Sequence, residues 1–179
     1  MRLHSHNGAE FMGTEIGTEE CQWYVVHSKL NQEERANSNL VAWGVETLYA
    51  KLKTRRHNTF TGALTYITEP LFPRYIIARF NAREQLFKIL YTRGVHDIVC
   101  FGDRPACVSE EIIEIIRARI DQNGFVKVSN DLKPGDRAVI NAGPLRNLIE
   151  MFEREVKGSE RSMILLTAIG YQGPSQNIE

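Results

Sequence analysis

The sequence lacks the marks of a secreted, membrane-spanning or disulfide-bonded protein. Its three cysteines, Cys21, Cys100 and Cys107, have no C-x-x-C spacing, which argues against a disulfide framework and against a thiolate zinc site. No apolar run approaches the roughly 20 residues that span a bilayer. Residues 1–8 contain no apolar segment of the kind found in secretory signals. We therefore expect a soluble, cytoplasmic protein that contacts no membrane and is a monomer.

The sequence also lacks net charge. Its 22 Lys and Arg residues balance 22 Asp and Glu residues, so no global basic field attracts nucleic acid. The densest local basic patch is formed by Lys51, Lys53, Arg55 and Arg56. This patch is either a solvated loop or a nucleic-acid contact.

Catalytic motifs are missing as well. There is no P-loop and no G-x-G-x-x-G sequence, and Ser159 and Ser162 have no glycine elbow. His96 and Asp97 are adjacent, but adjacent residues of a strand face opposite ways, so they do not suit a catalytic dyad. The sequence predicts no enzyme, no metal and no cofactor.

What is present is the element pattern of an α+β domain over residues 22–122, with helices on an antiparallel sheet. A mobile extension over residues 1–21 is expected before it. Asn31, Asn81 and Ser109 are expected N-caps of three helices, the first two with glutamates in capping-box position. The first helix should bury Ala36, Leu40 and Trp43. Strands are expected over residues 23–27, 74–80 and 97–101, and a loop or hairpin over residues 49–68.

The strand that begins at Arg74 has two apolar faces. Tyr75 and Ile77 point one way, while Ile76, Ala78 and Phe80 point the other. One face of a half-buried strand is normally polar, so a helix, another domain or a partner must cover the second face.

A polar linker over residues 123–133 leads to a small second unit, residues 134–179. This unit is expected to begin with a short strand over residues 137–141 and a turn at Gly143-Pro144.

Several segments together resemble NusG-type transcription factors. The resemblance covers about residues 22–170 and is closest to RfaH-like paralogues at residues 69–73 and 160–166. It is carried by Trp23-Tyr-Val-Val-His-Ser-Lys29, Glu69-Pro-Leu-Phe-Pro-Arg-Tyr75, Thr92-Arg-Gly-Val95, Val99-Cys-Phe-Gly102, Lys133-Pro-Gly-Asp-Arg137 and Gly143-Pro-Leu145.

The resemblance implies a transcription elongation and antitermination factor that binds RNA polymerase and suppresses pausing. Its N-terminal (NGN) domain would hold the β′ clamp helices in an apolar depression and touch the β gate loop opposite. The matching positions in the depression and at its rim are Tyr75, Ile77, Phe101, Leu71, Phe72 and Pro73. Alternatively, these residues simply pack in the core or beneath the second domain.

RfaH-like proteins also contact the non-template DNA strand. The positions that match are Lys29, Arg35, Thr92 and Arg93, where cations would hold phosphates. Asn39 stands where the RfaH pattern has a histidine. Ordinary surface or helix-end roles for these residues are the alternative.

The resemblance implies a KOW module at the C-terminus, a small five-stranded SH3-like β-barrel that tethers the ribosome or the termination factor Rho. The periodicity there is ambiguous. Leu145, Leu148, Ile149 and Phe152 have helical spacing, and residues 163–169 suit either a strand or a helix with Met163, Leu166 and Ile169 on one face.

RfaH-like proteins resolve this ambiguity by folding the C-terminal domain as a helical hairpin that masks the clamp-binding depression. A carboxylate–arginine pair holds the masked form, and the matching residues are Glu69 and Arg161. A permanent barrel with Arg161 on its surface is the other possibility. A ribosome-associated RNA-binding KOW protein is the alternative function.

Overall fold

The computed structural model describes residues 21–58, 60–126, 144–152 and 156–170. Its main sheet has the strand order β2-β5-β1-β6, with β9 also paired to β1. Every pairing in this sheet is antiparallel. The strands are β1 (Gln22–Ser28), β2 (Glu46–Leu48), β5 (Tyr75–Phe80), β6 (Val95–Ile98) and β9 (Cys107–Val108). With helices on both of its faces, this sheet confirms the expected α+β class.

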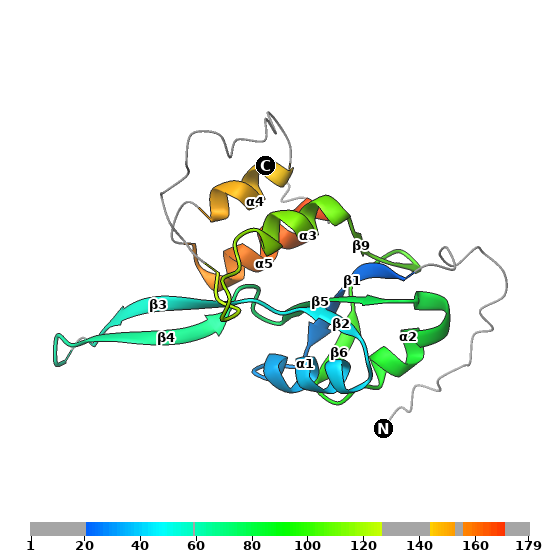
Figure 1. Ribbon diagram of the computed structural model, residues 1–179, viewed down its shortest axis with the longest axis horizontal. Helices are drawn as coiled ribbons and strands as arrows, with labels where there is room; N and C mark the ends of the chain where they lie inside the picture. Colours follow the sequence, from blue (N-terminus) through cyan, green and yellow to red (C-terminus); the bar gives the residue numbers. More distant parts are fainter. Residues whose placement is uncertain (1–20, 59, 127–143, 153–155, 171–179) are drawn as a thin grey trace, which may run out of the picture.

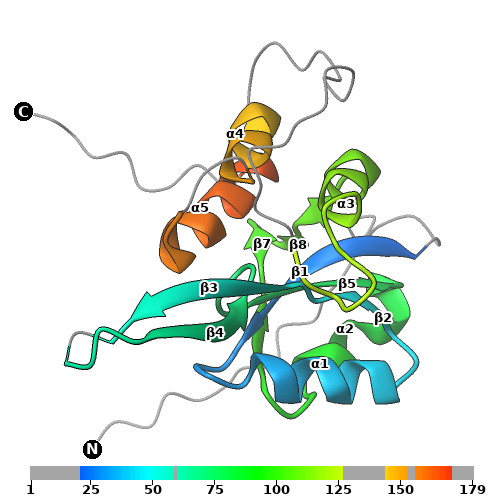
Figure 2. The ribbon, with the colours of Figure 1, turned by 60° about the vertical axis from the view of Figure 1, so that its left-hand side comes forward.

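The two faces of β1 and β5 belong to two separate hydrophobic clusters, as the alternation of side chains predicted. Ile76, Ala78 and Phe80 pack with α1 (Glu33–Ala42) and α2 (Ala82–Leu90). Ile77 packs on the other face with α3 (Glu110–Arg117) and two C-terminal helices. Figures 1 and 2 show α1 and α2 on one side of the sheet and the other helices across it.

The expected cap of the first helix is wrong. Asn31 has φ 56°, and Gln32 is the N-cap of α1. The chain turns tightly here, with the Gln32 amide donating to the Lys29 carbonyl at 3.0 Å. Trp43, expected in the core, lies one residue beyond the helix and is 52% exposed. Lys88 covers the face of its ring instead.

The second helix, α2, begins after the N-cap that the sequence predicted, Asn81. The Asn81 side chain accepts from the amides of Arg83 and Glu84. The reciprocal bond of the capping box comes from Gln85 rather than Glu84, because the Gln85 side chain accepts from the Asn81 amide at 2.9 Å. Ser109 is the N-cap of α3, but its side chain makes no capping bond.

The strand expected over residues 97–101 is interrupted at Val99. Its amide donates to Val25 and its carbonyl accepts from Ala106, so the chain leaves the edge of the main sheet at that point. Beyond it, β7 (Cys100–Phe101) pairs with β8 (Arg104–Pro105) as a separate two-stranded unit.

Residues 49–68, expected as a loop or hairpin, form a hairpin. Strand β3 (Lys51–His57) pairs with β4 (Leu64–Pro70) along its whole length. We call these two strands and the turn between them the ribbon. It projects from the body of the molecule in Figures 1 and 2. At its base, the Leu71 amide donates to Ala50, and Lys51 bridges to Phe125.

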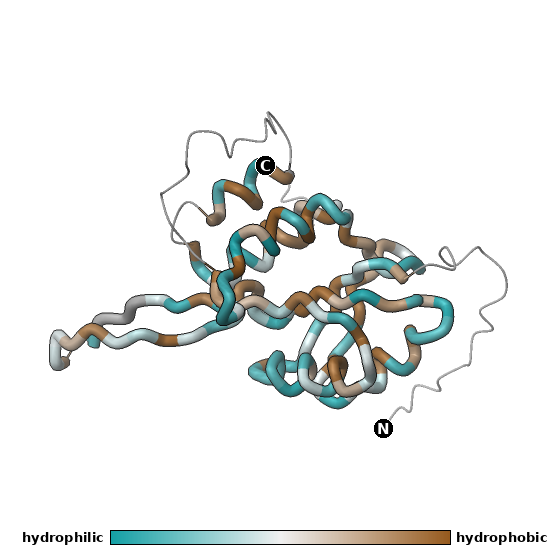
Figure 3. The backbone as a smooth tube through the Cα atoms, viewed as in Figure 1, coloured by the Kyte–Doolittle hydropathy of each residue, from teal (hydrophilic) through white to brown (hydrophobic). Residues whose placement is uncertain are grey.

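The described part of the C-terminal region is helical. Helices α4 (Pro144–Met151) and α5 (Gly158–Ala168) pack against each other, and residues 144–152 and 156–170 contain no strand of the expected barrel. Figure 3 shows apolar residues alternating with polar ones along α3 and α5. The expected extension over residues 1–20, the strand over 137–141, Gly143 and most of the linker lie outside the described residues.

Candidate docking face and its helical cover

The residues expected in the apolar depression lie together on one face of the sheet. Ile77 of β5 is 1% exposed, and the loop before β5 adds Leu71 and Phe72, which are also buried. Tyr75 is half-buried, and Phe101 of β7 lies at the rim with 37% exposure. We define the docking face as Leu71, Phe72, Pro73, Tyr75, Ile77 and Phe101. Sequence reasoning therefore located an apolar surface that a second element must cover.

Helices α4 and α5, which we call the helical cover, lie on this face. Leu148, Phe152 and Leu165 are at most 1% exposed within the cluster that contains Ile77. Leu145 packs at the edge of the same cluster, and Ile149 is half-buried. Of the stripe predicted for α4, Leu148 and Phe152 are thus fully buried, and Met151, which was not predicted, is buried with them at 2% exposure.

The stripe predicted for α5 is displaced around the helix. Met163, expected on the buried face, is 50% exposed. The buried residues are Arg161, Ser162, Leu165 and Leu166, so the packed face is centred on the i, i+4 pair Arg161 and Leu165. Met163 lies two residues, or about 200°, away from Arg161 around the helix. Sequence reasoning missed Leu165 because the four apolar residues in a row, 163–166, fit several helical faces.

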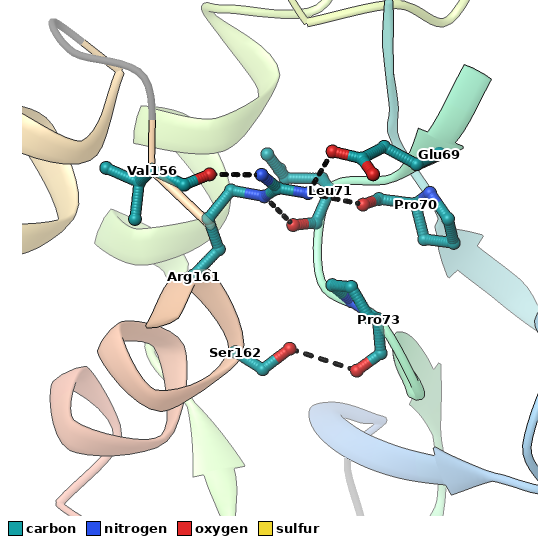
Figure 4. A network of polar contacts seen from close by, with 7 residues as sticks. All are labelled: Glu69, Pro70, Leu71, Pro73, Val156, Arg161 and Ser162. Carbon is teal, nitrogen blue, oxygen red and sulfur yellow. Dashed lines mark hydrogen bonds and ion pairs between the residues drawn. The ribbon is translucent and has the colours of Figure 1, made fainter. Parts of the chain in front are cut away.

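Arg161 is 3% exposed, and its guanidinium binds four oxygens, shown in Figure 4. Nε donates to the Leu71 carbonyl at 2.7 Å, and Nη1 donates to the Val156 carbonyl. Nη2 donates to the Glu69 carboxylate at 2.9 Å and to the Pro70 carbonyl at 3.2 Å. The expected pair of Glu69 and Arg161 is therefore present, together with three backbone acceptors that the sequence did not reveal.

This network fixes where the helical cover lies more than it adds net stability. Burying a charge is costly, and pairing it roughly repays that cost. An incorrectly placed cover would leave the guanidinium without acceptors, which is far more unfavourable. The network therefore discriminates strongly between the observed position of α5 and shifted positions.

A second contact brings the start of α5 against Pro73. The Ser162 hydroxyl donates to the Pro73 carbonyl at 2.9 Å. A Cβ built on Gly158 would lie 2.7 Å from Cγ of Pro73, closer than such atoms can approach. Gly158 is therefore needed for this close approach of helix and loop. The sequence could have indicated this contact, because a glycine stands at the first residue of α5.

The residues expected to contact DNA lie near α1, on the side of the sheet opposite the docking face. The Lys29 amide donates to the Gly94 carbonyl at 2.8 Å, and the Asn39 side chain donates to the Arg93 carbonyl at 2.8 Å. These bonds join the chain after β1, helix α1 and the turn before β6. Gly94 has φ 99°, and a Cβ there would lie 2.9 Å from the Ala36 amide nitrogen, so this turn requires glycine.

Three of the four expected DNA residues offer accessible cations. Lys29, Arg35 and Arg93 are exposed. Thr92 differs, because it is 4% exposed and its hydroxyl donates to the Lys88 carbonyl at 2.8 Å. It closes the end of α2 instead of presenting a donor to a ligand.

His27 borders the docking face, with its ring stacked on Tyr75 at 5.0 Å between centroids. Burial lowers the pKa of His27 below 6.5, and the charges of Arg74 and His96 lower this pKa further, against a smaller opposing effect of Asp97. The fold therefore favours neutral His27.

This shift predicts a loss of stability in acid. Because the pKa of His27 is lower in the folded state, the unfolded state binds the proton more readily as pH falls below about 6.5. Urea midpoints should fall between about pH 7.5 and pH 5, and His27→Gln should flatten that slope. His96→Gln should keep most of it, because burial is the main cause. An unchanged slope in His27→Gln would contradict this account.

The described residues offer no evident centre for metal chemistry. Among them, no group of three or more His, Cys, Asp or Glu residues could hold a metal ion. Nor is any helix in the described ranges long and apolar enough to cross a membrane.

Comparison with known proteins bears on the whole arrangement. A family model described as "Transcription termination factor nusG" matches residues 21–117, more than half of the chain. A solved structure titled "Domain interaction in Thermotoga maritima NusG" is similar to 54% of this chain, at 19% sequence identity and a TM-score of 0.35. The match spans 55% of that protein's length. Similarity at this level does not indicate a function for this chain.

Proposed function

This chain belongs to the NusG family of non-enzymatic transcription factors, and on that premise we propose that it binds the β′ clamp helices of RNA polymerase through the docking face. Contact with the β gate loop opposite would bridge the cleft, hold the clamp closed on DNA and suppress pausing. The supporting observation is that the docking face already holds a helical hairpin, α4 with α5. The clamp helices are an occupant of the same kind, so the two would compete for one surface.

We further propose that the factor is autoinhibited, like the RfaH-like members of the family. The intact chain would bind polymerase weakly until α4 and α5 leave. The polar character of the Arg161 contacts supports this view, because water can satisfy the Glu69 carboxylate and the three carbonyls after release. A cover held by apolar packing alone would expose a larger apolar area on leaving.

On release, residues 134–179 would fold as the KOW barrel and tether the ribosome or Rho. The proposed organisation is an NGN domain over residues 22–122, a linker over 123–133 and this convertible domain. The short hydrophobic runs of α4 and α5 suit either strands or helices, and the packing partner decides between them. Such refolding is rare, but two packings of one sequence can differ by only a few kcal/mol.

The cations around α1 are proposed to hold the non-template strand during elongation. Lys29, Arg35 and Arg93 would contact phosphates, and the bond from the Asn39 side chain to the Arg93 carbonyl would hold this part of the surface in place. A ribosome-associated RNA-binding KOW protein remains the alternative. It predicts co-purification with ribosomal subunits and without RNA polymerase, and it gives the covered docking face no function.

Binding of a β′ clamp-helix fragment to variants of the whole chain tests the main proposal. Leu148→Asp places a charge in the cluster beneath α4 and should release the helical cover, because an unpaired buried charge is strongly unfavourable. We expect this variant to bind the fragment where the unmodified chain binds weakly. Adding Phe101→Asp at the rim should then reduce affinity roughly 10-fold, because it removes an aromatic contact and places a charge against an apolar partner.

Phe87→Asp provides the matched control, because Phe87 is 69% exposed on α2, across the sheet from the docking face. Its addition to Leu148→Asp should leave fragment affinity unchanged. Equal losses from the Phe101 and Phe87 changes would argue that the fragment binds elsewhere. Failure of Leu148→Asp to bind the fragment at all would overturn the proposal.

A further inference from the structure

The base of the ribbon joins the body, where Leu52 is buried in the core and Glu69 binds Arg161, whereas the outer part of the ribbon projects away from the body. Strands β3 and β4 form their own two-stranded sheet and do not extend the main one. Residues 64–68 of β4 are all exposed. The views in Figures 1 and 2 show most of its length standing clear of the body. A protruding ribbon of this kind is available to a partner.

The ribbon carries a concentrated positive charge on a chain whose net charge is zero. Strand β3 contains four Lys and Arg residues among its seven, and no Asp or Glu occurs between Leu52 and Thr68. The one carboxylate of β4 is Glu69, at the base and bound to Arg161. Lys51 is likewise engaged at the base, with Glu34 at 2.6 Å. The outer ribbon is therefore purely cationic, whereas the remainder of the chain is net negative.

Aromatic and hydroxyl groups accompany this charge. Tyr66 is 64% exposed and stands directly opposite Arg55 in the strand register. Phe60, in the turn at the tip, is 97% exposed. Thr54 and Thr68 lie on the paired strands nearer the base. A mixture of cations, hydroxyls and aromatic rings suits a polyanion that has phosphates and stacked bases.

We propose that the ribbon is a second nucleic-acid-binding element, which lies along the major groove of double-stranded DNA. The major groove of B-form DNA is wide enough to admit a two-stranded β-ribbon. The major groove of A-form RNA is too narrow and deep for side chains to read, so the shape favours DNA over duplex RNA. Lys53, Arg55 and Arg56 supply the phosphate contacts, and Tyr66 and Phe60 supply apolar contacts. This site is separate from the cations around α1.

The salt dependence of binding measures the number of phosphate contacts directly. With a fluorescein-labelled B-form duplex and the full chain, the three ribbon cations should contribute about −2.7 to the slope of log K against log salt. Arg55→Gln with Arg56→Gln should reduce the magnitude of that slope by about 1.8 and weaken binding at low salt more than at high salt. Tyr66→Ser should weaken binding without changing the slope.

A matched control removes the same charge from the body. Arg83→Gln with Arg104→Gln changes two exposed cations outside the ribbon and should leave the slope unchanged. An equal change in both double variants would show a general charge effect and overturn the proposal. Equal or tighter binding of an A-form RNA duplex would overturn the assignment to DNA. Clamp-fragment binding should be unaffected by the ribbon variants, so this inference and the proposed function can fail independently.

Discussion

Replacing Arg161 with methionine is expected to raise the affinity of the intact chain for a β′ clamp-helix fragment by roughly 100-fold. Methionine retains much of the apolar stem but removes all donors to Glu69, Pro70, Leu71 and Val156. Each carbonyl left without a donor in the closed state costs about 1–3 kcal/mol, and about 3 kcal/mol in total would shift the equilibrium toward the released cover by that factor. Titration of the labelled fragment measures the change.

The comparison variant is Arg146→Met in α4. Arg146 also pairs with a carboxylate, Glu150, but both side chains are substantially exposed, so the pair contributes little. Its affinity for the fragment should stay within about twofold of the unmodified chain. If Arg146→Met and Arg161→Met have the same effect, the buried network does not hold the cover in place.

Changing Gly158 to alanine is expected to release the cover while strengthening the helix that leaves. The added Cβ would lie 2.7 Å from Pro73, and such overpacking costs about 1–3 kcal/mol. Alanine also favours a helix by up to about 1 kcal/mol over glycine. Fragment affinity should therefore rise by roughly 10- to 100-fold. Surface plasmon resonance against the immobilised fragment would measure it.

Ser159→Ala separates the two effects of that change. Ser159 is exposed at the start of α5, so alanine there increases helix propensity without contact with Pro73. Its fragment affinity should remain unchanged or fall slightly. A rise of similar size in Ser159→Ala, which makes no new contact with Pro73, would mean that the contact at Pro73 does not control release.

The sequence predicted three strands of the main sheet, β1, β5 and β6, because their apolar residues stand out, whereas the short strands β2 and β9 were not expected. The alternation predicted both faces of β5, with Tyr75 and Ile77 on one and Ile76, Ala78 and Phe80 on the other. These two faces belong to two different hydrophobic clusters. Asn81 was likewise found as a cap, since its side-chain bonds are local. Features set by neighbours in the chain were predictable.

Features that depend on residues distant in the sequence were not predictable. Asn31 has the residue type of a cap, but the turn at Lys29 and the bond from the Arg74 amide to Glu33 begin the helix one residue later than expected. Met163 and Leu165 are equally apolar, and only the position of Arg161 over the loop before β5 decides which one is buried. On our proposal, the helical state of residues 144–152 and 156–170 would depend in the same way on the surface beneath them.

Of the four oxygens that receive the Arg161 guanidinium, three belong to the main chain. Those three acceptors persist whatever side chains occupy positions 70, 71 and 156, provided that the path of the loop is kept. Position 69 alone contributes through its side chain. If the cover is released as we propose, substitutions at position 69 would change how readily it leaves, while the three main-chain acceptors for α5 would be kept.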